Sequence, residues 1–235
     1  RAVREARAAR GALDTASYAV ANVNVVPMTA DTVLRAHTVV VRGGRIAAAA
    51  PAGEADVAGL RTIDGAGRWL VPGLADTHTH LFSDGREVHD SAGPAELGVM
   101  LANGVTAARL MIGTPEQLAL REGVRAGTVL GPQLWLASPH LAGRAFDHNA
   151  IAVTSAAEAR AAVRRVADAG YDFVKLTLFI TPPVYDAVVD EARARGIRVV
   201  GHVDPQVGVA RALETGQQLE HLDSYLEAAL DDSAP

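Results

Sequence analysis

The 235-residue sequence contains no cysteine, a single lysine and few aromatic residues. The absence of cysteine excludes disulfide bonds, thiolate metal sites and cysteine nucleophiles. Aromatic residues make up only 4% of the chain, so stacking platforms for nucleic-acid bases are not expected. The net charge of −5, with no long run of one sign, argues against nucleic-acid binding and against a polybasic membrane-binding surface.

Long apolar runs are also missing: no stretch approaches the roughly 18 to 20 uninterrupted apolar residues that span a membrane. Apolar residues nevertheless make up 49% of the chain, which is enough for a substantial core. At this length the chain has room for one α/β barrel or for two small domains. The sequence starts at Arg1, as it would after removal of a signal peptide or without some other upstream segment, so the compartment stays open.

The local pattern divides the sequence into three parts. Residues 1–16 are rich in Ala and Arg with little apolar face, and we expect a helical or disordered leader. Residues 17–69 hold short Val-rich runs broken by Gly and Pro, which is typical of a small β-sandwich, and Gly43-Gly44 predicts a hairpin turn. In residues 70–235 strand-like and helix-like segments alternate, which predicts a parallel sheet because parallel strands need crossover connections.

Residues 70–235 favour a barrel over an open Rossmann sheet, since no Gly-rich dinucleotide-binding motif follows the first strand. Helix starts are recognisable between the strands: Ser155 and Glu158 have capping-box spacing, and Thr114-Pro115 is typical of a helix N-terminus, with Gln117 also at capping-box spacing from Thr114. A (β/α)8 barrel needs eight strands, so we expect a barrel truncated after about six. The six strand-like runs are residues 70–77, 104–111, 132–138, 172–178, 198–203 and 217–222.

Possible metal ligands lie at or near the ends of four of these strands. His78 and His80 are two residues apart, so in a strand both imidazoles point to the same face and can bind one cation. Lys175, His202 and His221 belong to the fourth, fifth and sixth strands. Each histidine by itself is more often structural than metal-binding. Barrel enzymes, however, build their sites at the C-terminal ends of strands, and the joint pattern therefore predicts one shared site.

Lys175 is the only lysine among 22 basic residues, and it lies in an apolar strand. Burying a charged amine costs several kcal/mol unless it is neutralised or paired, and arginine could not become neutral in its place. Two chemistries need a neutral lysine at a strand end: a Schiff base, and carbamylation by CO2, which makes the side chain a bridging ligand for two metal ions. The four histidines favour the two-metal site, and a Schiff-base lyase that uses Lys175 stays as the alternative.

Residues 71–80, VPGLADTHTH, resemble the signature of the amidohydrolase superfamily, in its imidazolonepropionase- and prolidase-like branch. Lys175, His202 and His221 follow in the strand order of that superfamily, and the resemblance covers residues 18–235. It implies a TIM-like (β/α)8 barrel with a small β-sandwich. It also implies a metal-dependent hydrolase that cleaves a C–N bond in an amide, peptide or cyclic amide.

By the same resemblance, His78 and His80 would hold one metal ion, His202 and His221 a second, and a CO2-derived carbamate on Lys175 would bridge both. A metal-activated hydroxide would then attack the substrate carbonyl, with Lys175, His202 and His221 as catalytic residues. Zinc suits a histidine-rich ligand set, and manganese, iron and cobalt are the alternatives.

The superfamily takes a final aspartate from strand eight, and this sequence ends before such a strand. We therefore expect an N-terminal portion of the enzyme, completed by a missing C-terminal segment or a second chain; a non-catalytic subunit is the other interpretation. Unpaired strand edges would also favour a homo-oligomer. Candidate contacts for a small-molecule amide or peptide substrate are His140 and Arg144, in the expected loop after the third strand, and Tyr225, four residues after His221.

Overall fold

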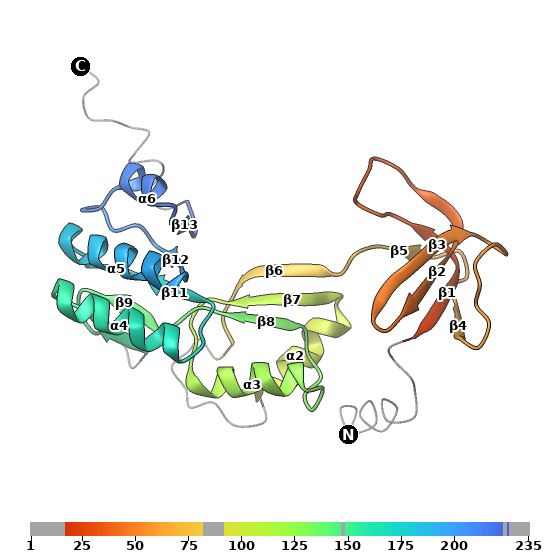
Figure 1. Ribbon diagram of the computed structural model, residues 1–235, viewed down its shortest axis with the longest axis horizontal. Coiled ribbons are helices and arrows are strands. Elements are labelled where there is room, and N and C mark those ends of the chain that lie inside the picture. The colour runs from red at the N-terminus through yellow and green to blue at the C-terminus, as the bar shows by residue number, and fades with distance from the viewer. Residues whose placement is uncertain (1–16, 82–91, 147–148, 223–224, 226–235) are drawn as a thin grey trace, which may run out of the picture. The chain divides into compact units, whose positions relative to one another are not determined.

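The computed structural model describes residues 17–81, 92–146, 149–222 and 225, and Figure 1 shows their arrangement. The leader predicted for residues 1–16 lies outside the described residues. The chain forms two compact units, with the boundary between Leu74 and Ala75. Each unit is described by itself.

The first unit is a five-stranded sheet. Strand β1 pairs antiparallel with β2 and parallel with β4 and β5, and β2 pairs antiparallel with β3. Gly43 and Gly44, with φ of 57° and 75°, make the turn between β2 and β3, which confirms the predicted hairpin. Val23, Val25 and Val39 form its buried cluster. The strands are β1 (Tyr18–Val25), β2 (Leu34–Arg42), β3 (Arg45–Pro51), β4 (Arg61–Asp64) and β5 (Trp69–Leu70).

The second unit contains the six predicted barrel strands, which lie in the order β6-β7-β8 and β11-β12-β13. A parallel bridge between Ala137 and Phe173 joins the two groups. Within the described part of the chain these strands do not close into a ring. They are β6 (Leu74–Thr79), β7 (Val105–Leu110), β8 (Gln133–Leu136), β11 (Phe173–Leu176), β12 (Arg198–Gly201) and β13 (Gln218–Leu219).

Two further strands, β9 (His140–Ala142) and β10 (Ala150–Ala152), were not predicted. They lie in the segment after the third barrel strand, where the sequence suggested a loop. β9 pairs with β10 and, through Leu141 and Leu176, with the end of β11. The candidate residue His140 therefore belongs to a strand rather than to a loop.

Helices connect the strands and begin where local capping predicts. The Ser155 hydroxyl accepts a hydrogen bond from the Glu158 N–H, and the Glu158 carboxylate accepts one from the Ser155 N–H, so the predicted capping box is confirmed. At the start of α3 the Thr114 hydroxyl caps the Gln117 N–H, but the Gln117 side chain donates to the Leu81 carbonyl instead. The helices are α2 (Ala92–Ala102), α3 (Pro115–Arg125), α4 (Ala156–Asp168), α5 (Pro182–Arg195) and α6 (Val209–Thr215).

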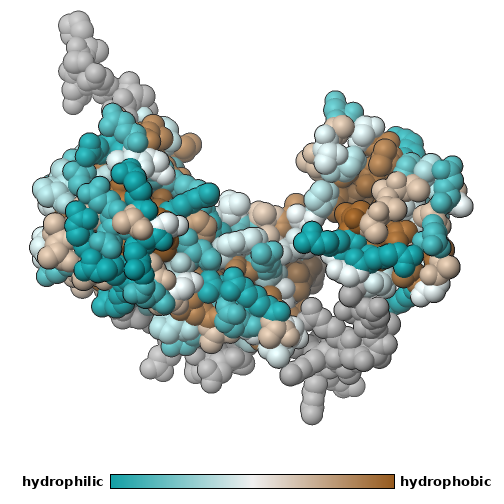
Figure 2. All heavy atoms as spheres, in the orientation of Figure 1, coloured by the Kyte–Doolittle hydropathy of each residue, from teal (hydrophilic) through white to brown (hydrophobic). Residues whose placement is uncertain are grey.

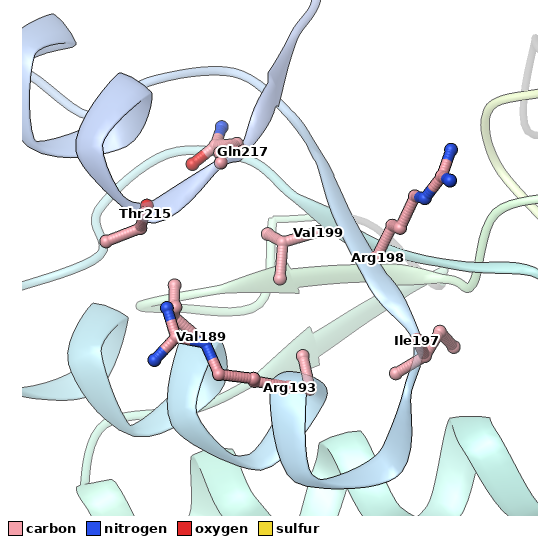
Figure 3. Close-up of a pocket in the computed structure, with 9 residues that line it drawn as sticks. Val189, Arg193, Ile197, Arg198, Val199, Thr215 and Gln217 are labelled. Carbon is pink, nitrogen blue, oxygen red and sulfur yellow. The ribbon is translucent and has the colours of Figure 1, made fainter.

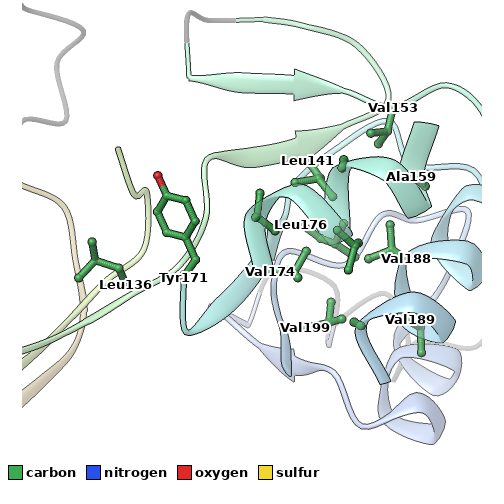
Figure 4. Packing of buried hydrophobic residues seen from close by; sticks show 14 of the residues in the cluster. Leu136, Leu141, Val153, Ala159, Tyr171, Val174, Leu176, Val188, Val189 and Val199 are labelled. Atoms are coloured by element: carbon green, nitrogen blue, oxygen red, sulfur yellow. The ribbon is translucent and has the colours of Figure 1, made fainter. Parts of the chain in front are cut away.

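The strands of the second unit present alternate residues to two environments, because successive side chains of a strand point to opposite faces. On the outer face, Val174, Leu176 and Val199 pack against the helices in the main buried cluster, which Figure 4 shows. On the inner face, Phe173 and Val200 pack with the small cluster of Met111 and Ala137. The same alternation places Arg109 and Lys175 on the inner face.

The outer surface of the helices is strongly charged. Ion pairs link α4 to α5, with Arg160 Nη2 3.3 Å from Asp190 Oδ2 and Arg164 Nη1 3.0 Å from Glu191 Oε2. Hydrophilic residues accordingly predominate over these two helices in Figure 2. Among the described residues, no helix is long and apolar enough to cross a membrane.

Candidate active site

Four of the predicted site histidines lie side by side at the C-terminal ends of the inner strands. The His78 ring lies 5.1 Å from that of His80 and 4.6 Å from that of His221, measured between centroids. The His221 ring in turn lies 4.9 Å from that of His202. The fold therefore brings residues from β6 and from the segments after β12 and β13 into one row of imidazoles.

His78 and His80 face each other through their Nε2 atoms, which are 3.2 Å apart. Zinc–nitrogen bonds of about 2.0–2.1 Å at a tetrahedral angle would separate two ligating nitrogens by about 3.3–3.4 Å. The two Nε2 atoms thus lie close to the separation that one tetrahedral ion requires.

Glu220, which follows β13, is a partner of this pair that the sequence did not single out. His78 Nδ1 lies 2.7 Å from Glu220 Oε2, within hydrogen-bond distance, and Arg109 Nη2 donates to Glu220 Oε1 at 2.5 Å. Arg109 also donates from Nη1 to Gln218 Oε1 at 2.9 Å and from Nε to the Thr77 carbonyl at 2.6 Å. The sequence does contain a feature that points to this pair: each of two apolar strand-like segments carries a charged residue, Arg109 in residues 104–111 and Glu220 in residues 217–222.

Lys175 is only 2% exposed, on the inner face of β11. Its backbone N–H donates to Ser138 Oγ at 3.0 Å. Burial lowers the pKa of the Lys175 amine from 10.5 to about 8; the nearby Glu220 carboxylate opposes this shift and the Arg109 guanidinium adds to it. A substantial neutral fraction near physiological pH is what both chemistries predicted for this residue require.

His80 is held in the neutral form. Burial, together with the electrostatic influence of the nearby His78 and Lys175, lowers its pKa from 6.5 to about 4. Its Nδ1 atom is buried and has no hydrogen-bond partner. A neutral imidazole keeps a lone pair, which is the state that binds a metal ion.

The backbone has unusual φ angles directly before His202 and at His221 itself. Gly201, directly before His202, has φ of 129°, and a Cβ there would lie 2.1 Å from the Leu176 carbonyl oxygen. His221 has φ of 64°. Strand alternation would put Glu220 and His221 on opposite faces, and the left-handed conformation of His221 takes its ring out of that pattern.

The three predicted substrate contacts lie in different settings, and only His140 is shown to lie near the histidine row. His140 is 6% exposed, lies close enough to His80 to lower its pKa, and has its ring 5.4 Å from that of Phe146. Arg144 places its guanidinium 4.0 Å from the centre of the Phe179 ring. Tyr225 is 39% exposed.

The donor chemistry of the site fits divalent metal ions, since four imidazoles and a lysine of lowered pKa gather on one face. The residues that the structure describes contain no group of three or more His, Asp or Glu side chains arranged to hold an ion as they stand. The Nε2 atoms of His78 and His80 are the part of the set that already has a ligand-like separation.

A separate pocket of about 160 Å³ lies on the helix-covered side of the sheet, between α5, β12 and the turn before β13 (Figure 3). Val189, Ile197 and Val199 give it an apolar wall, and Arg193 lies beside them. Gln217 closes it and donates from Nε2 to the His202 carbonyl at 3.0 Å. This pocket contains none of the predicted site residues.

Comparison with known proteins relates the second unit to amidohydrolases. The amidohydrolase family profile matches residues 69–234, which is more than half of the chain. The imidazolonepropionase of Stenotrophomonas maltophilia (strain R551-3) is 37% identical over 97 residues, which cover 37% of this chain and 23% of the relative. That of Bradyrhizobium diazoefficiens is 44% identical over 54 residues, covering 22% of this chain and 13% of the relative.

Solved structures extend the likeness to most of the chain. A putative prolidase from Bifidobacterium longum is 31% identical with a TM-score of 0.73, and the match covers 87% of this chain and 54% of that one. Bottromycin amidohydrolase is 25% identical with a TM-score of 0.73, covering 92% of this chain and 45% of that one. The chain thus spans about half of these structures and less than a quarter of the curated relatives, and its strands have the arrangement of an amidohydrolase TIM barrel. The chain belongs to the amidohydrolase family.

Proposed function

We propose that this chain carries the metal-binding residues of a hydrolase that cleaves the C–N bond of an amide, peptide or cyclic amide. The observation that carries the proposal is the gathering of His78, His80, His202 and His221 into one row on the face that also holds Lys175. Membership of the amidohydrolase family supports it, as do relatives named imidazolonepropionase, prolidase and bottromycin amidohydrolase.

In this proposal His78 and His80 hold one divalent ion, His202 and His221 hold a second, and zinc is the preferred metal. When bound, the ions supply Lewis acidity, which polarises a carbonyl and lowers the pKa of water. Burial keeps His80 neutral and able to bind metal near pH 7. We propose no residue of this chain for the final aspartate of the family site.

Lys175 has a specific part in the proposal. With a pKa of about 8, roughly a quarter of its amine is neutral at pH 7.5, compared with about a thousandth for an ordinary lysine. The neutral Nζ can attack CO2, forming an N–C bond and releasing one proton, which turns the neutral amine into an anionic carbamate. That anion would bridge the two metal ions.

His140, Arg144 and Tyr225 are the proposed substrate contacts. His140 lies near His80 and could orient a carbonyl. The exposed guanidinium of Arg144, stacked on Phe179, could bind an anionic group of the substrate.

The test measures metal content and hydrolysis of amide and dipeptide substrates with the purified chain, before and after chelation. We expect divalent metal to co-purify and Lys175→Ala to reduce it, with wild-type levels in the surface variant Arg165→Ala. Borohydride trapping of Lys175 on a carbonyl substrate, with activity that survives chelation, would overturn the proposal in favour of the Schiff-base lyase.

A further inference from the structure

We propose that Glu220, held in place by Arg109, is the positioning residue that fixes the tautomer of His78 and so prepares its Nε2 atom to bind a divalent cation. The inference rests on the proposed metal centre and adds two residues to it. Neither belongs to the set of ligands predicted from the sequence.

The Glu220 side chain is only 7% exposed, and both of its oxygens have strong donors. Oε2 lies 2.7 Å from His78 Nδ1, and Oε1 accepts from Arg109 Nη2 at 2.5 Å. A carboxylate that forms an ion pair with a guanidinium can only accept hydrogen bonds. The proton in the contact to His78 therefore sits on Nδ1.

Arg109 is itself held from three sides, which gives the carboxylate a fixed orientation. Besides Glu220, its guanidinium donates to the Gln218 side chain at 2.9 Å and to the Thr77 carbonyl at 2.6 Å. Its charged group also lies 5.5 Å from the centre of the Phe173 ring. These contacts connect β6, β7 and β13 on the inner face of the sheet, and a lysine amine could not make all of them.

The consequence for His78 follows from the two nitrogens of its ring. A neutral imidazole carries one N–H, so a proton on Nδ1 leaves a lone pair on Nε2. That Nε2 lies 3.2 Å from His80 Nε2, where the cation would bind. Without the carboxylate, the Nε2–H tautomer becomes available and places a proton in the position of the metal. Carboxylates that accept from the second nitrogen of a ligating histidine typically contribute 10- to 100-fold to metal affinity.

The experiment compares Glu220→Gln with Glu214→Gln, which removes an exposed carboxylate from the neighbouring helix α6. Long-range ¹H–¹⁵N spectra of the metal-free chain with ¹⁵N-histidine report the His78 tautomer directly. Zinc affinity is measured by competition with a chromophoric chelator. We expect wild type and Glu214→Gln to show the Nδ1–H form of His78. We expect Glu220→Gln to show a mixture of tautomers and a 10- to 100-fold weaker affinity for zinc.

Arg109→Lys is the second variant, and it keeps the inference testable if Glu220→Gln does not fold, as judged by circular dichroism. It retains both His78 and Glu220 but loses the planar guanidinium that orients the Glu220 carboxylate. Zinc affinity should therefore fall by a smaller factor than in Glu220→Gln. Equal zinc affinity and an unchanged His78 tautomer in the Glu220 and Arg109 variants would overturn the inference even if the chain hydrolyses amides. A Glu220-dependent affinity in a chain that cleaves no amide would overturn only the proposed function.

Discussion

Gly201 and Leu176 approach each other so closely that no side chain fits between them: a Cβ on Gly201 would lie 2.1 Å from the Leu176 carbonyl oxygen. The same oxygen accepts a hydrogen bond from the His202 N–H at 3.1 Å. The close approach therefore sets where the backbone of His202 leaves β12. A residue of the proposed site thus depends on a glycine that carries no chemistry of its own.

Replacement of Gly201 by Ala should be costly for both stability and metal binding. The φ of 129° strains any other residue, and the added methyl must push β12 away from β11. We expect the free energy of unfolding to fall by about 3 kcal/mol or more in urea titrations, with weaker zinc binding. The control is Gly98→Ala in α2, where an added Cβ meets nothing within 4 Å, and which should be neutral or slightly stabilising. Equal stability of the two variants would contradict this account of Gly201.

Replacement of Lys175 by Met should stabilise the metal-free, CO2-free chain at neutral pH. Below pH 8 the folded chain buries a protonated amine whose pKa is lowered to about 8, while the unfolded chain keeps a pKa near 10.5. The difference corresponds to a penalty on the order of 3 kcal/mol.

The pH dependence tests the sign of the Lys175 effect. Between pH 8 and 10.5 the unfolded chain binds more protons than the folded one, so the stability of the wild type should rise relative to Lys175→Met and their difference should close. Chemical denaturation at pH 7, 8.5 and 10 measures it. Because the chain has one lysine, a difference that does not change with pH would show that Lys175 does not titrate in this range.

His80 should make the second unit sensitive to mild acid. Its pKa is lowered to about 4 in the folded chain from an ordinary value of 6.5, so between these values the unfolded chain binds the proton preferentially. The contribution of His80 to the free energy of unfolding should be fully present above pH 6.5 and should be lost as the pH falls toward 4. Urea unfolding at pH 7 and 5 should show a smaller loss for His80→Asn than for the wild type. The matched variant His37→Asn in the first unit should keep the full loss, and an identical loss in both variants would argue against His80.

Asp172→Ala should be among the most destabilising substitutions outside the site. Asp172 Oδ2 accepts from Arg121 Nη1 and from the Leu136 N–H, both at 2.8 Å, and the Arg121 side chain is only 8% exposed. Removing the carboxylate takes away the shorter of the two ion pairs of the buried Arg121 guanidinium, which then keeps only the exposed Glu122 carboxylate at 3.2 Å, at a cost of about 2–3 kcal/mol. Asp190→Ala breaks the exposed pair with Arg160 and should cost less than about 1 kcal/mol by thermal or urea unfolding. A cost for Asp172→Ala as small as that for Asp190→Ala would count against this account.

Local features of the fold could be predicted from the sequence because their causes lie within a few residues. The Ser155 and Glu158 capping box and the Gly43-Gly44 hairpin formed where expected. The prediction failed for β9 and β10, because short strands are specified by the neighbours with which they pair, here β11 through Leu141 and Leu176. The Gln117 side chain left its predicted local role for the same reason, since the Leu81 carbonyl offered it a tertiary partner.

For the site, the sequence by itself determined the candidate metal ligands. The two-residue period of a strand places His78 and His80 on one face. The candidates Lys175, His202 and His221 could be recognised from their positions in or near the ends of apolar strands. Only the tertiary structure decided which of them meet and what holds them. Glu220 contacts His78 across 142 positions of sequence, and His221 reaches the histidine row through a left-handed backbone conformation. The period of a strand assigns a residue to a face, whereas strand order, curvature and backbone strain decide which residues of that face come into contact.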